Sequence, residues 1–306
     1  MTENLTMRLV SRPCPLCEST DESRIFTEAD FDFDKLDAFA FASRKLPEYM
    51  HYRLIECGTC DALYASPVPT MDGLAEAYHE AAFDSQEEAR LAARTYGTFL
   101  SDIKKRLPDT RGALDIGAGD GAFLSELLAA GFTDVVGVEP SAAPIASAAA
   151  DVKPLLKHAL FRAEDFGEES FSLITCFQTL EHLSDPMAMC RAAQRLLKPG
   201  GALFVIAHDR RSLSAKVLGT KSPIFDIEHL QLFSPKSATQ LLERAGFGSV
   251  SLKTVKNAYP LHYWAKLFPV PKPVKLPLLR ALKSTGVGKV TIAISAGNLA
   301  AIGFKA

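Results

Sequence analysis

Short apolar runs alternate with amphipathic stretches along the chain from residue 112 onward. The apolar runs predict buried strands, and the stretches between them have the apolar spacing of helices. We expect strands at 113–116, 133–139, 171–177 and 202–208, a short strand at 154–157, and helices at 121–131, 141–150, 185–197 and 234–247. Ser141 and Ser234 stand where helix N-caps belong. This alternation predicts a doubly wound, mainly parallel α/β sheet.

The alternation breaks near the C-terminal end of the sequence. Residues 249–255 and 298–305 both have the pattern of strands, and the insert between them, 258–297, is aromatic and rich in proline. A parallel crossover needs a connecting helix of sufficient length, and the pattern of the insert does not predict one. We therefore predict that the last two strands pair antiparallel.

The N-terminal part has a different texture. Residues 1–70 carry two Cys-x-x-Cys pairs and an acid- and Phe-rich stretch, and residues 71–110 have the pattern of helices. We expect three parts: a small cysteine-bearing module at 1–70, a helical connector at 71–110 that walls a pocket, and an α/β domain at 111–306 that contains the insert.

Composition and charge are those of an ordinary globular protein. The chain has 306 residues, of which 47% are hydrophobic, and its formal net charge is −2. This charge gives no reason to expect a nucleic-acid partner. The sequence has no apolar run of the roughly 18 residues that a membrane span needs, and its start lacks the apolar core of a secretory signal. We expect a cytoplasmic protein with no membrane or nucleic-acid partner.

The turn after the first strand, in ALDIGAGDGAF, carries the first chemical signal. Gly117, Gly119 and Gly121 follow Asp115 at alternate positions, at the sheet edge where open α/β folds bind ligands. The dinucleotide fingerprint is G-x-G-x-x-G, whereas this turn is G-x-G-x-G, with Asp115 before it and Asp120 just ahead of its last glycine. Two carboxylates would repel a pyrophosphate and attract a cation. The turn therefore favours a zwitterionic ligand that bears a sulfonium.

Two further acids fit a nucleoside. Glu139 ends the second strand about twenty residues after the turn, where an acid accepts hydrogen bonds from ribose hydroxyls. Asp165 precedes the strand at 171–177 and could accept from an adenine amino group.

With these motifs in view, residues 112–306 resemble the class I S-adenosylmethionine-dependent methyltransferases. LDIGAGDGAF, VVGVEPS, RAEDF, FQTLEHLSDP and LLKPGG occur in the family's order and at compatible spacing. The resemblance implies a seven-stranded Rossmann-like sheet with an antiparallel last strand, and S-adenosylmethionine as cofactor. The residues that it assigns to the cofactor are Asp115, Gly117, Ala118 and Gly119 for the methionine end, Glu139 and Pro140 for the ribose, Asp165 and Phe166 for the adenine, and Phe177 and Gln178 beside them.

The stretch after the fourth long strand would then lie over the methyl group. His182 can act as a base near neutral pH, and Glu181 could do so if its pKa is raised. His229, in the stretch FDIEHLQLF, is a second candidate base, and His208 lies at the same sheet edge. The alternative is that these residues cap helices and shape the pocket. Tyr259, Tyr263 and Trp264 could line an acceptor pocket or belong to a lid or core.

The cysteine pairs predict a metal site. Cys14, Cys17, Cys57 and Cys60 supply the four thiolates of a structural Zn²⁺ site with no open position for catalysis. The alternative is a set of reduced, unligated cysteines. Cys176 and Cys190 fall in a strand and a helix, and we expect them to be buried as small apolar residues.

A four-cysteine module joined to this domain resembles the sugar C-methyltransferase group, although the further C-terminal domain of that group is not present. We expect a bacterial methyltransferase that acts on a small molecule, a sugar or secondary metabolite, by in-line displacement. The alternatives are an NAD-dependent oxidoreductase, a zinc-containing nucleic-acid-binding protein and a non-catalytic protein. The acid-flanked turn counts against the first, and the absence of a basic cluster in residues 1–70 counts against the second.

Overall fold

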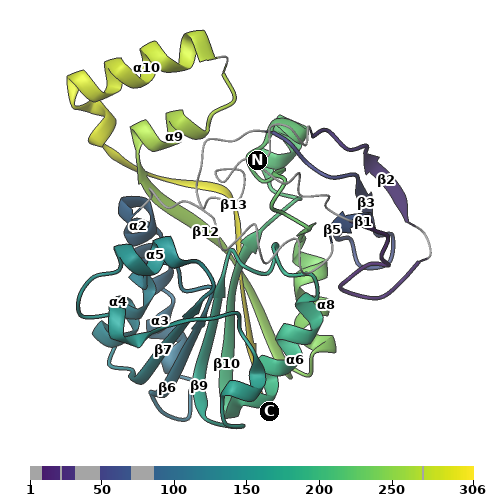
Figure 1. Ribbon diagram of the computed structural model, residues 1–306, viewed down its shortest axis with the longest axis vertical. Coiled ribbons are helices and arrows are strands. Elements are labelled where there is room, and N and C mark those ends of the chain that lie inside the picture. Colours follow the sequence, from purple (N-terminus) through teal and green to yellow (C-terminus); the bar gives the residue numbers. More distant parts are fainter. Residues whose placement is uncertain (1–8, 21–22, 32–48, 70–85, 271) are drawn as a thin grey trace, which may run out of the picture.

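The computed structural model describes residues 9–20, 23–31, 49–69, 86–270 and 272–306. A seven-stranded sheet forms the centre of the molecule. Its strands are β6 (Arg111–Ile116), β7 (Thr133–Glu139), β8 (Leu156–His158), β9 (Phe171–Phe177), β10 (Leu197–His208), β12 (Ser249–Pro260) and β13 (Thr291–Phe304). They lie in the order β12-β13-β10-β9-β6-β7-β8 (Figure 1). The order reverses between β6 and β9, which places a topological switch point at the carboxyl ends of these strands.

The sheet is parallel except at β13. Strands β6 to β10 pair parallel with one another, and β13 runs antiparallel between β10 and β12. The predicted antiparallel ending and the α/β fold class are therefore confirmed.

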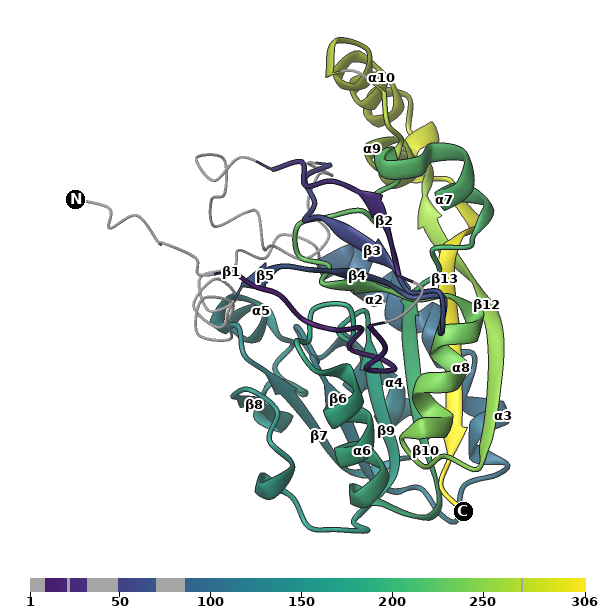
Figure 2. The same ribbon diagram turned by 90° about the vertical axis from the view of Figure 1, so that its right-hand side faces the viewer.

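Helices cover both faces of this sheet because its central strands alternate between two cores (Figure 2). Along β10, Leu203 and Val205 join the core under α6 (Pro186–Leu196) and α8 (Pro235–Arg244). Phe204 and Ile206 join the core under α2 (Gln86–Gly97), α3 (Leu100–Lys104) and α4 (Ala122–Ala129). A strand that is apolar at every position is buried on both faces, as in other doubly wound sheets.

Local capping fixes where two of these helices begin. Asp185 accepts a hydrogen bond from the Ala188 amide at 2.8 Å at the start of α6. Ser234 and Ser237 form a reciprocal capping box at the start of α8, so the predicted cap at Ser234 is confirmed. Ser141 occupies the N-cap position of α5 (Ala142–Ser147), but its side chain makes no capping hydrogen bond.

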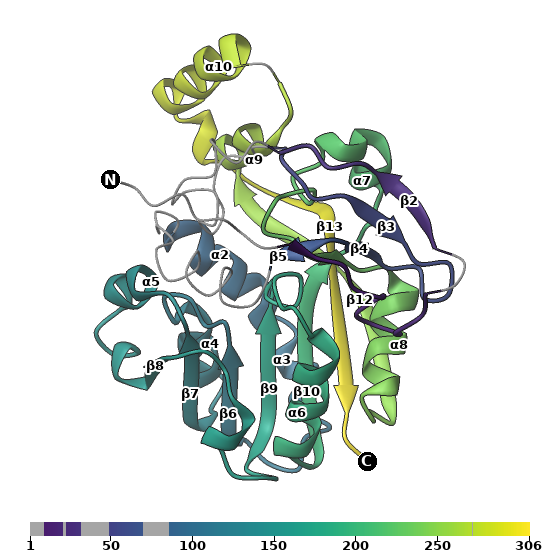
Figure 3. The same ribbon diagram turned by 45° about the vertical axis from the view of Figure 1, so that its right-hand side comes forward.

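The N-terminal module is completed by a strand from the α/β domain. Strands β2 (Arg24–Thr27), β3 (Leu54–Glu56) and β4 (Leu63–Ala65) form an antiparallel sheet whose fourth strand is β11 (Gln231–Leu232). Strands β1 (Leu9–Val10) and β5 (Val68–Pro69) pair separately. A third apolar core joins the two parts, with Leu54 and Leu63 packed in one cluster with Phe225 and Ile227. Figure 3 shows the small sheet near the carboxyl ends of β9 and β10.

The C-terminal insert is helical, which corrects one expectation. It contains α9 (Leu261–Leu267), α10 (Lys272–Thr285) and the short 3₁₀ helix η5 (Val287–Lys289). The prediction that no sizeable helix lies between the last two strands was wrong, because α10 accommodates Pro277 inside the helix. The two helices form an excursion beyond the sheet edge, from which the chain returns antiparallel (Figure 1).

Within the described part of the chain, the helices all fall short of the length and apolar character that crossing a bilayer requires. The predicted helical connector is seen as α2 and α3, and its residues 71–85 lie outside the described residues.

Candidate active site and cysteine cluster

A cavity of about 1270 Å³ opens at the carboxyl ends of the parallel strands. Its wall combines the turns after β6, β7 and β9 with residues from α2, from residues 208–229 and from the C-terminal insert. Of the residues proposed from sequence for the cofactor, eight line it: Asp115, Gly117, Ala118, Gly119, Glu139, Pro140, Phe177 and Gln178. This volume exceeds that of a typical small-molecule site, so it can hold two ligands at once.

The glycine turn after β6 needs its glycines for two different reasons. A Cβ on Gly117 would lie 2.3 Å from Thr179 Oγ1, so this position has no room for a side chain. Gly119 has φ +56°, and a Cβ there would meet nothing within 4 Å. The missing side chain of Gly119 therefore faces open cavity, and only a ligand could fill that space.

Asp115 is a buried carboxyl beneath this turn. Its Oδ1 accepts a hydrogen bond from Thr175 Oγ1 at 2.6 Å, and the residue is 3% exposed. Burial raises the pKa of Asp115 to about 7, with the nearby Glu139 adding to the rise and the Thr175 hydrogen bond opposing it. A cation bound beside Asp115 would restore its charge.

Glu139 holds the glycine turn against the end of β7. One carboxylate oxygen accepts from the Gly119 amide at 2.9 Å, and the other accepts from the Ser141 amide at 2.8 Å. The Ser141 side chain hydrogen-bonds this carboxylate as well, and a carboxylate with about four acceptor sites keeps one for a ligand hydroxyl. Burial raises the pKa of Glu139 in spite of these backbone hydrogen bonds.

The segment proposed to contact adenine lies only partly on the cavity wall. Residues 160–164 line the cavity, and Ala163–Asp165 form the 3₁₀ helix η3. Asp165 pairs with Arg162 at 3.2 Å on the exposed side of this helix. Phe166 stacks on Phe161 with ring centroids 6.2 Å apart. In the described structure the cavity wall does not include Asp165 or Phe166; Phe161 and Glu164 stand there instead.

Phe177 and Gln178 mark the end of β9 on the cavity floor. Phe177 packs edge-on against Phe123 and Tyr96, at centroid distances of 4.6 and 5.0 Å. Gln178 adopts φ +49°, a left-handed conformation that is uncommon for a residue with a side chain. Its Nε2 lies 3.5 Å from Asn298 Oδ1, so the side chain bridges toward β13.

Three imidazoles gather on the opposite wall. The ring of His229 lies between His182 and His208, with centroid distances of 5.0 and 4.9 Å. Each outer ring has a glutamate beside it: Glu228 Oε2 is 3.6 Å from His182 Nδ1, and Glu181 Oε1 is 3.2 Å from His208 Nδ1. Sequence analysis singled out all three histidines, and the fold brings them together from three separate segments.

The central histidine has a defined tautomer. His229 Nδ1 lies 2.8 Å from the carbonyl oxygen of Ile224. A carbonyl only accepts, so Nδ1 carries the proton and Nε2 is left as an acceptor. Burial lowers the pKa of His229, and the neighbouring His208 lowers it further. His229 is therefore a neutral ring at physiological pH.

The other two candidate bases from sequence, His182 and Glu181, have low pKa values. Burial lowers the pKa of His182 to about 3, and its proximity to His229 adds to this, so His182 accepts a proton poorly. Glu181 is fully buried behind the cavity wall. Burial raises the pKa of Glu181, but His208 outweighs burial and brings it to about 2. The raised pKa that a Glu181 base would need is thus not found.

Glu181 joins three segments instead. Its Oε1 accepts from the His208 amide at 2.6 Å. Its backbone carbonyl accepts from the amides of Leu230 and Gln231 at 2.8 and 3.3 Å. A carboxylate in this position orients the loops that carry His208 and His229.

The four predicted cysteine ligands form one cluster. Their Sγ atoms all lie within 4.8 Å of one another, with Cys14 and Cys60 3.5 Å apart and Cys17 and Cys57 also 3.5 Å apart. Tetrahedral zinc with Zn–S bonds of about 2.3 Å would place its sulfurs about 3.8 Å apart. The cluster thus has the donor set and spacing of a four-thiolate metal site. Cys176 and Cys190 are buried in the core, as expected.

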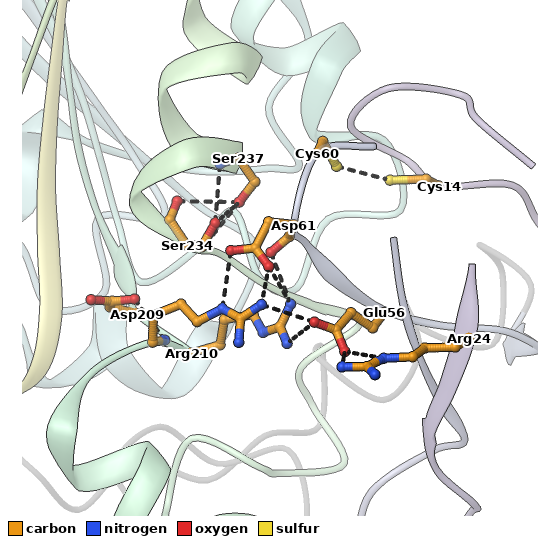
Figure 4. A network of polar contacts seen from close by, with 10 residues as sticks. Cys14, Arg24, Glu56, Cys60, Asp61, Asp209, Arg210, Ser234 and Ser237 are labelled. Atoms are coloured by element: carbon orange, nitrogen blue, oxygen red, sulfur yellow. Dashed lines mark hydrogen bonds and ion pairs between the residues drawn. The ribbon is translucent and has the colours of Figure 1, made fainter. Parts of the chain in front are cut away.

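An ionic network connects this cluster to the cavity wall (Figure 4). Glu56 and Asp61 flank the second cysteine pair, and Arg210 lies two residues after His208. The Arg210 guanidinium donates to Glu56 Oε1 at 2.8 Å and to Asp61 Oδ1 at 3.0 Å. Burial raises the pKa of Glu56, but Arg210 and Arg24 outweigh it and hold that pKa below its ordinary value.

Some residues of the site carried no sequence signal. Thr175 lies inside an apolar strand, and Asn298 begins a predicted strand, so neither stood out by pattern. Arg12 donates to the carbonyl oxygens of Ala65 and Ser184 at 3.0 Å each, which links the module to the loop after β9. Only the position of Asn298 at a strand end near the active edge could have pointed to it.

Comparison with known proteins defines the class. The profile of the methyltransferase domain family matches residues 83–252, and the chain belongs to this family. Together with the mixed seven-stranded sheet, this makes it a class I S-adenosylmethionine-dependent methyltransferase domain with an N-terminal four-cysteine cluster.

Individual relatives match only part of the chain. A ubiquinone biosynthesis O-methyltransferase of Pseudomonas aeruginosa (strain UCBPP-PA14) is 37% identical over 103 residues, which are 32% of this chain and 44% of that protein. The enzyme of that name from Aliivibrio fischeri (strain MJ11) is 28% identical over 144 residues, 43% of this chain and 61% of that protein. The matched region thus spans less than two thirds of the length of these curated relatives.

Solved structures match a larger share of this chain, at lower sequence identity. A S-adenosylmethionine-dependent methyltransferase from Thermotoga maritima is 21% identical with a TM-score of 0.47, over 72% of this chain and 92% of that one. Phosphoethanolamine N-methyltransferase 2 from Haemonchus contortus, solved with S-adenosylmethionine, is 15% identical with a TM-score of 0.43, over 68% and 52% of the two chains.

Proposed function

We propose that this protein transfers a methyl group from S-adenosylmethionine to a hydroxyl of a small molecule. The observation that carries the proposal is that one cavity joins the acid-flanked glycine turn to the three-histidine wall. The cofactor side supplies a seat for a cationic amino acid, and the opposite side supplies a proton acceptor.

The residues of this proposed seat suit S-adenosylmethionine. The backbone at Gly119 leaves open space for a ligand. A bound cation would favour the ionised form of the buried Asp115 carboxyl, and the Glu139 carboxylate can accept a hydrogen bond from a ribose hydroxyl. Bound there, the cofactor supplies an electrophilic methyl group on a sulfonium. Phe177 and Gln178 would close the floor of the same seat, and residues 160–164 would face the adenine.

His229 is the proposed general base. Its Nδ1–H bond to Ile224 leaves Nε2 free to take the proton of an acceptor hydroxyl. His182 and Glu181, the other two candidates from sequence, are proposed as positioning residues. His182 accepts a proton too poorly for this role, and Glu181 acts through the loops that it orients.

The acceptor is proposed to be a secondary metabolite with an apolar ring. Aromatic and aliphatic side chains of the insert face the cavity beyond the histidines, namely Tyr259, Tyr263, Trp264, Leu267 and Phe268. The two curated relatives named above are ubiquinone biosynthesis O-methyltransferases, which agrees with an oxygen acceptor. A sugar acceptor is the alternative.

The cysteine cluster is proposed to hold a structural Zn²⁺ through Cys14, Cys17, Cys57 and Cys60. All four thiolates are engaged, so the ion would have no open position for substrate. Its proposed role is to fix the module that supports the loops of His208 and His229.

Calorimetry and turnover test this function together. We expect S-adenosylmethionine to bind to the full chain and NAD not to bind. Phenolic and sugar acceptors are then offered with labelled cofactor, and we expect methyl ether formation on the phenolic set. Binding of NAD in place of S-adenosylmethionine would overturn the proposal, and methylation of sugars alone would overturn the acceptor class.

A further inference from the structure

The C-terminal insert and α7 (Leu213–Leu218) present apolar side chains to solvent. Of the large apolar residues that the described structure exposes, ten lie between residues 213 and 294: Leu213, Val217, Phe268, Val274, Leu276, Leu278, Val287, Val290, Ile292 and Ile294. Leu213 and Val217 are 78% and 72% exposed. Scattered exposed apolar residues need no explanation, but a concentration of this kind marks an interaction surface.

On helix α10 the exposed apolar residues are regularly spaced. Val274, Leu278 and Ala281 stand at i, i+4 and i+7, so they share one face, and all three are exposed. In Figure 1 this helix lies apart from the sheet and its covering helices. An exposed apolar row on a projecting helix has the form of an interfacial helix rather than a core helix.

The charge of this region is one-sided. Residues 244–306 contain ten lysines and arginines and no aspartate or glutamate, whereas the rest of the chain has 24 basic and 36 acidic residues. Arg280, Lys283 and Lys289 are exposed on or beside α10. Six of these ten basic residues lie in the insert 258–297, the segment that also exposes apolar side chains, and this positive charge complements an anionic surface.

The same surface borders the mouth of the cavity. Leu213, Val217, Phe268 and Ile294 are exposed and also line the cavity. At these four residues, exposed apolar side chains of α7 and of the insert are thus also part of the pocket wall. A ligand that partitions into a bilayer would meet the cavity at this rim.

We propose that α10 and the exposed rim of α7, Phe268 and Ile294 dock on an anionic lipid bilayer, so that the cavity mouth faces the membrane surface. The projecting helix α10 would insert its exposed apolar side chains one by one into the bilayer. A bilayer, unlike a protein partner, needs no surface of complementary shape. The second part, delivery of an amphiphilic acceptor from the bilayer, rests on the proposed function. The docking itself does not.

Vesicle co-sedimentation of the full chain tests the docking without any activity assay. Vesicles are made of phosphatidylcholine alone or with about one third phosphatidylglycerol. We expect the protein to sediment with the anionic vesicles, weakly with the neutral ones, and less as salt rises. Leu278→Asp should lower partitioning about ten-fold, because the apolar side chain that would insert into the bilayer is replaced by a charged one.

Ser284→Asp is the matched control, because it adds the same charge to an exposed position off the apolar row of α10. We expect it to lower partitioning only about two-fold. Unchanged S-adenosylmethionine affinity in both variants would show that the fold is intact. Equal loss in both variants, or no sedimentation with anionic vesicles, would overturn the proposal. So would a dimer by light scattering that Leu278→Asp converts to monomers, since the face would then join two copies of the chain.

Discussion

The two halves of the cavity are built in different ways. The half proposed to bind the cofactor, called the cofactor half below, is made by turns that directly follow consecutive strands and include Gly117, Gly119 and Asp115. The acceptor half is assembled from distant segments around His182, His208 and His229, and an ionic network holds it to the cysteine module. A local motif fixes the first half, whereas the second half depends on long-range contacts.

The largest effect is expected from the central histidine of the acceptor half. His229→Gln should lower kcat by about 10²- to 10⁴-fold, because it removes the proposed base. S-adenosylmethionine affinity, measured by calorimetry, should stay within about two-fold, since the cofactor half is built separately.

His262→Gln is the matched control for this variant. Its Nδ1 also lies near a backbone carbonyl, that of Gly288 at 2.9 Å, but the residue does not line the cavity. We expect its kcat to be close to that of the unmodified protein. A His229→Gln variant that keeps full turnover would show that the histidine wall is only structural.

Removal of the proposed zinc tests whether the cysteine module supports only the half proposed for the acceptor. Chelation, or Cys60→Ser, should lower turnover on the order of 10²-fold by displacing the loops of Arg210 and His229, since small misplacements are costly. Cofactor affinity should change much less. Parallel loss of cofactor binding in calorimetry would mean that the two halves are not independent.

A smaller effect should follow from filling the cradle of the cofactor half. Gly119→Ala adds a methyl group that no protein atom within 4 Å would contact, so beyond the strain of its positive φ the loss of affinity comes from contact with the ligand. We expect about ten-fold weaker S-adenosylmethionine binding. Gly286→Ala is the control, because Gly286 also has a positive φ (+72°) and open space. Gly286→Ala should lower the free energy of unfolding by a similar amount and leave the affinity for S-adenosylmethionine unchanged.

The effect that is smallest near neutral pH is a pH dependence of cofactor affinity, which amounts to about two-fold at pH 7 and grows below it. Because the pKa of Asp115 is raised to about 7, the carboxyl is protonated below that pH and does not attract a cation. Affinity should therefore fall by up to about ten-fold for each pH unit below 7 and level off above it. Calorimetry across this range, repeated with Asp115→Asn, checks the assignment: a profile that the substitution leaves unchanged would contradict it.

Much of the fold was predictable because it follows local pattern. The strands up to β10, the caps at Ser234 and the antiparallel ending rest on short-range periodicity and composition. The helix α10 was not predicted, because Pro277 and the neighbouring prolines argue against a helix interior. In the structure Pro277 nevertheless lies inside this helix, which projects beyond the sheet. Four cysteines in two close pairs likewise predicted a cluster that the fold then assembles.

The sequence by itself predicted much of the half proposed for the cofactor, since Asp115, the glycine turn and Glu139 follow consecutive strands whose ends meet at one edge, although Asp165 and Phe166 do not line the cavity. Only the tertiary structure decided how the histidines are used. It showed His229 between two other rings with its Nδ1 on a carbonyl, and Glu181 buried behind them with a low pKa. The ring neighbours of His229 and the burial and low pKa of Glu181 depend on segments that only the fold brings together, such as His208, 27 residues from Glu181, and local pattern does not encode them.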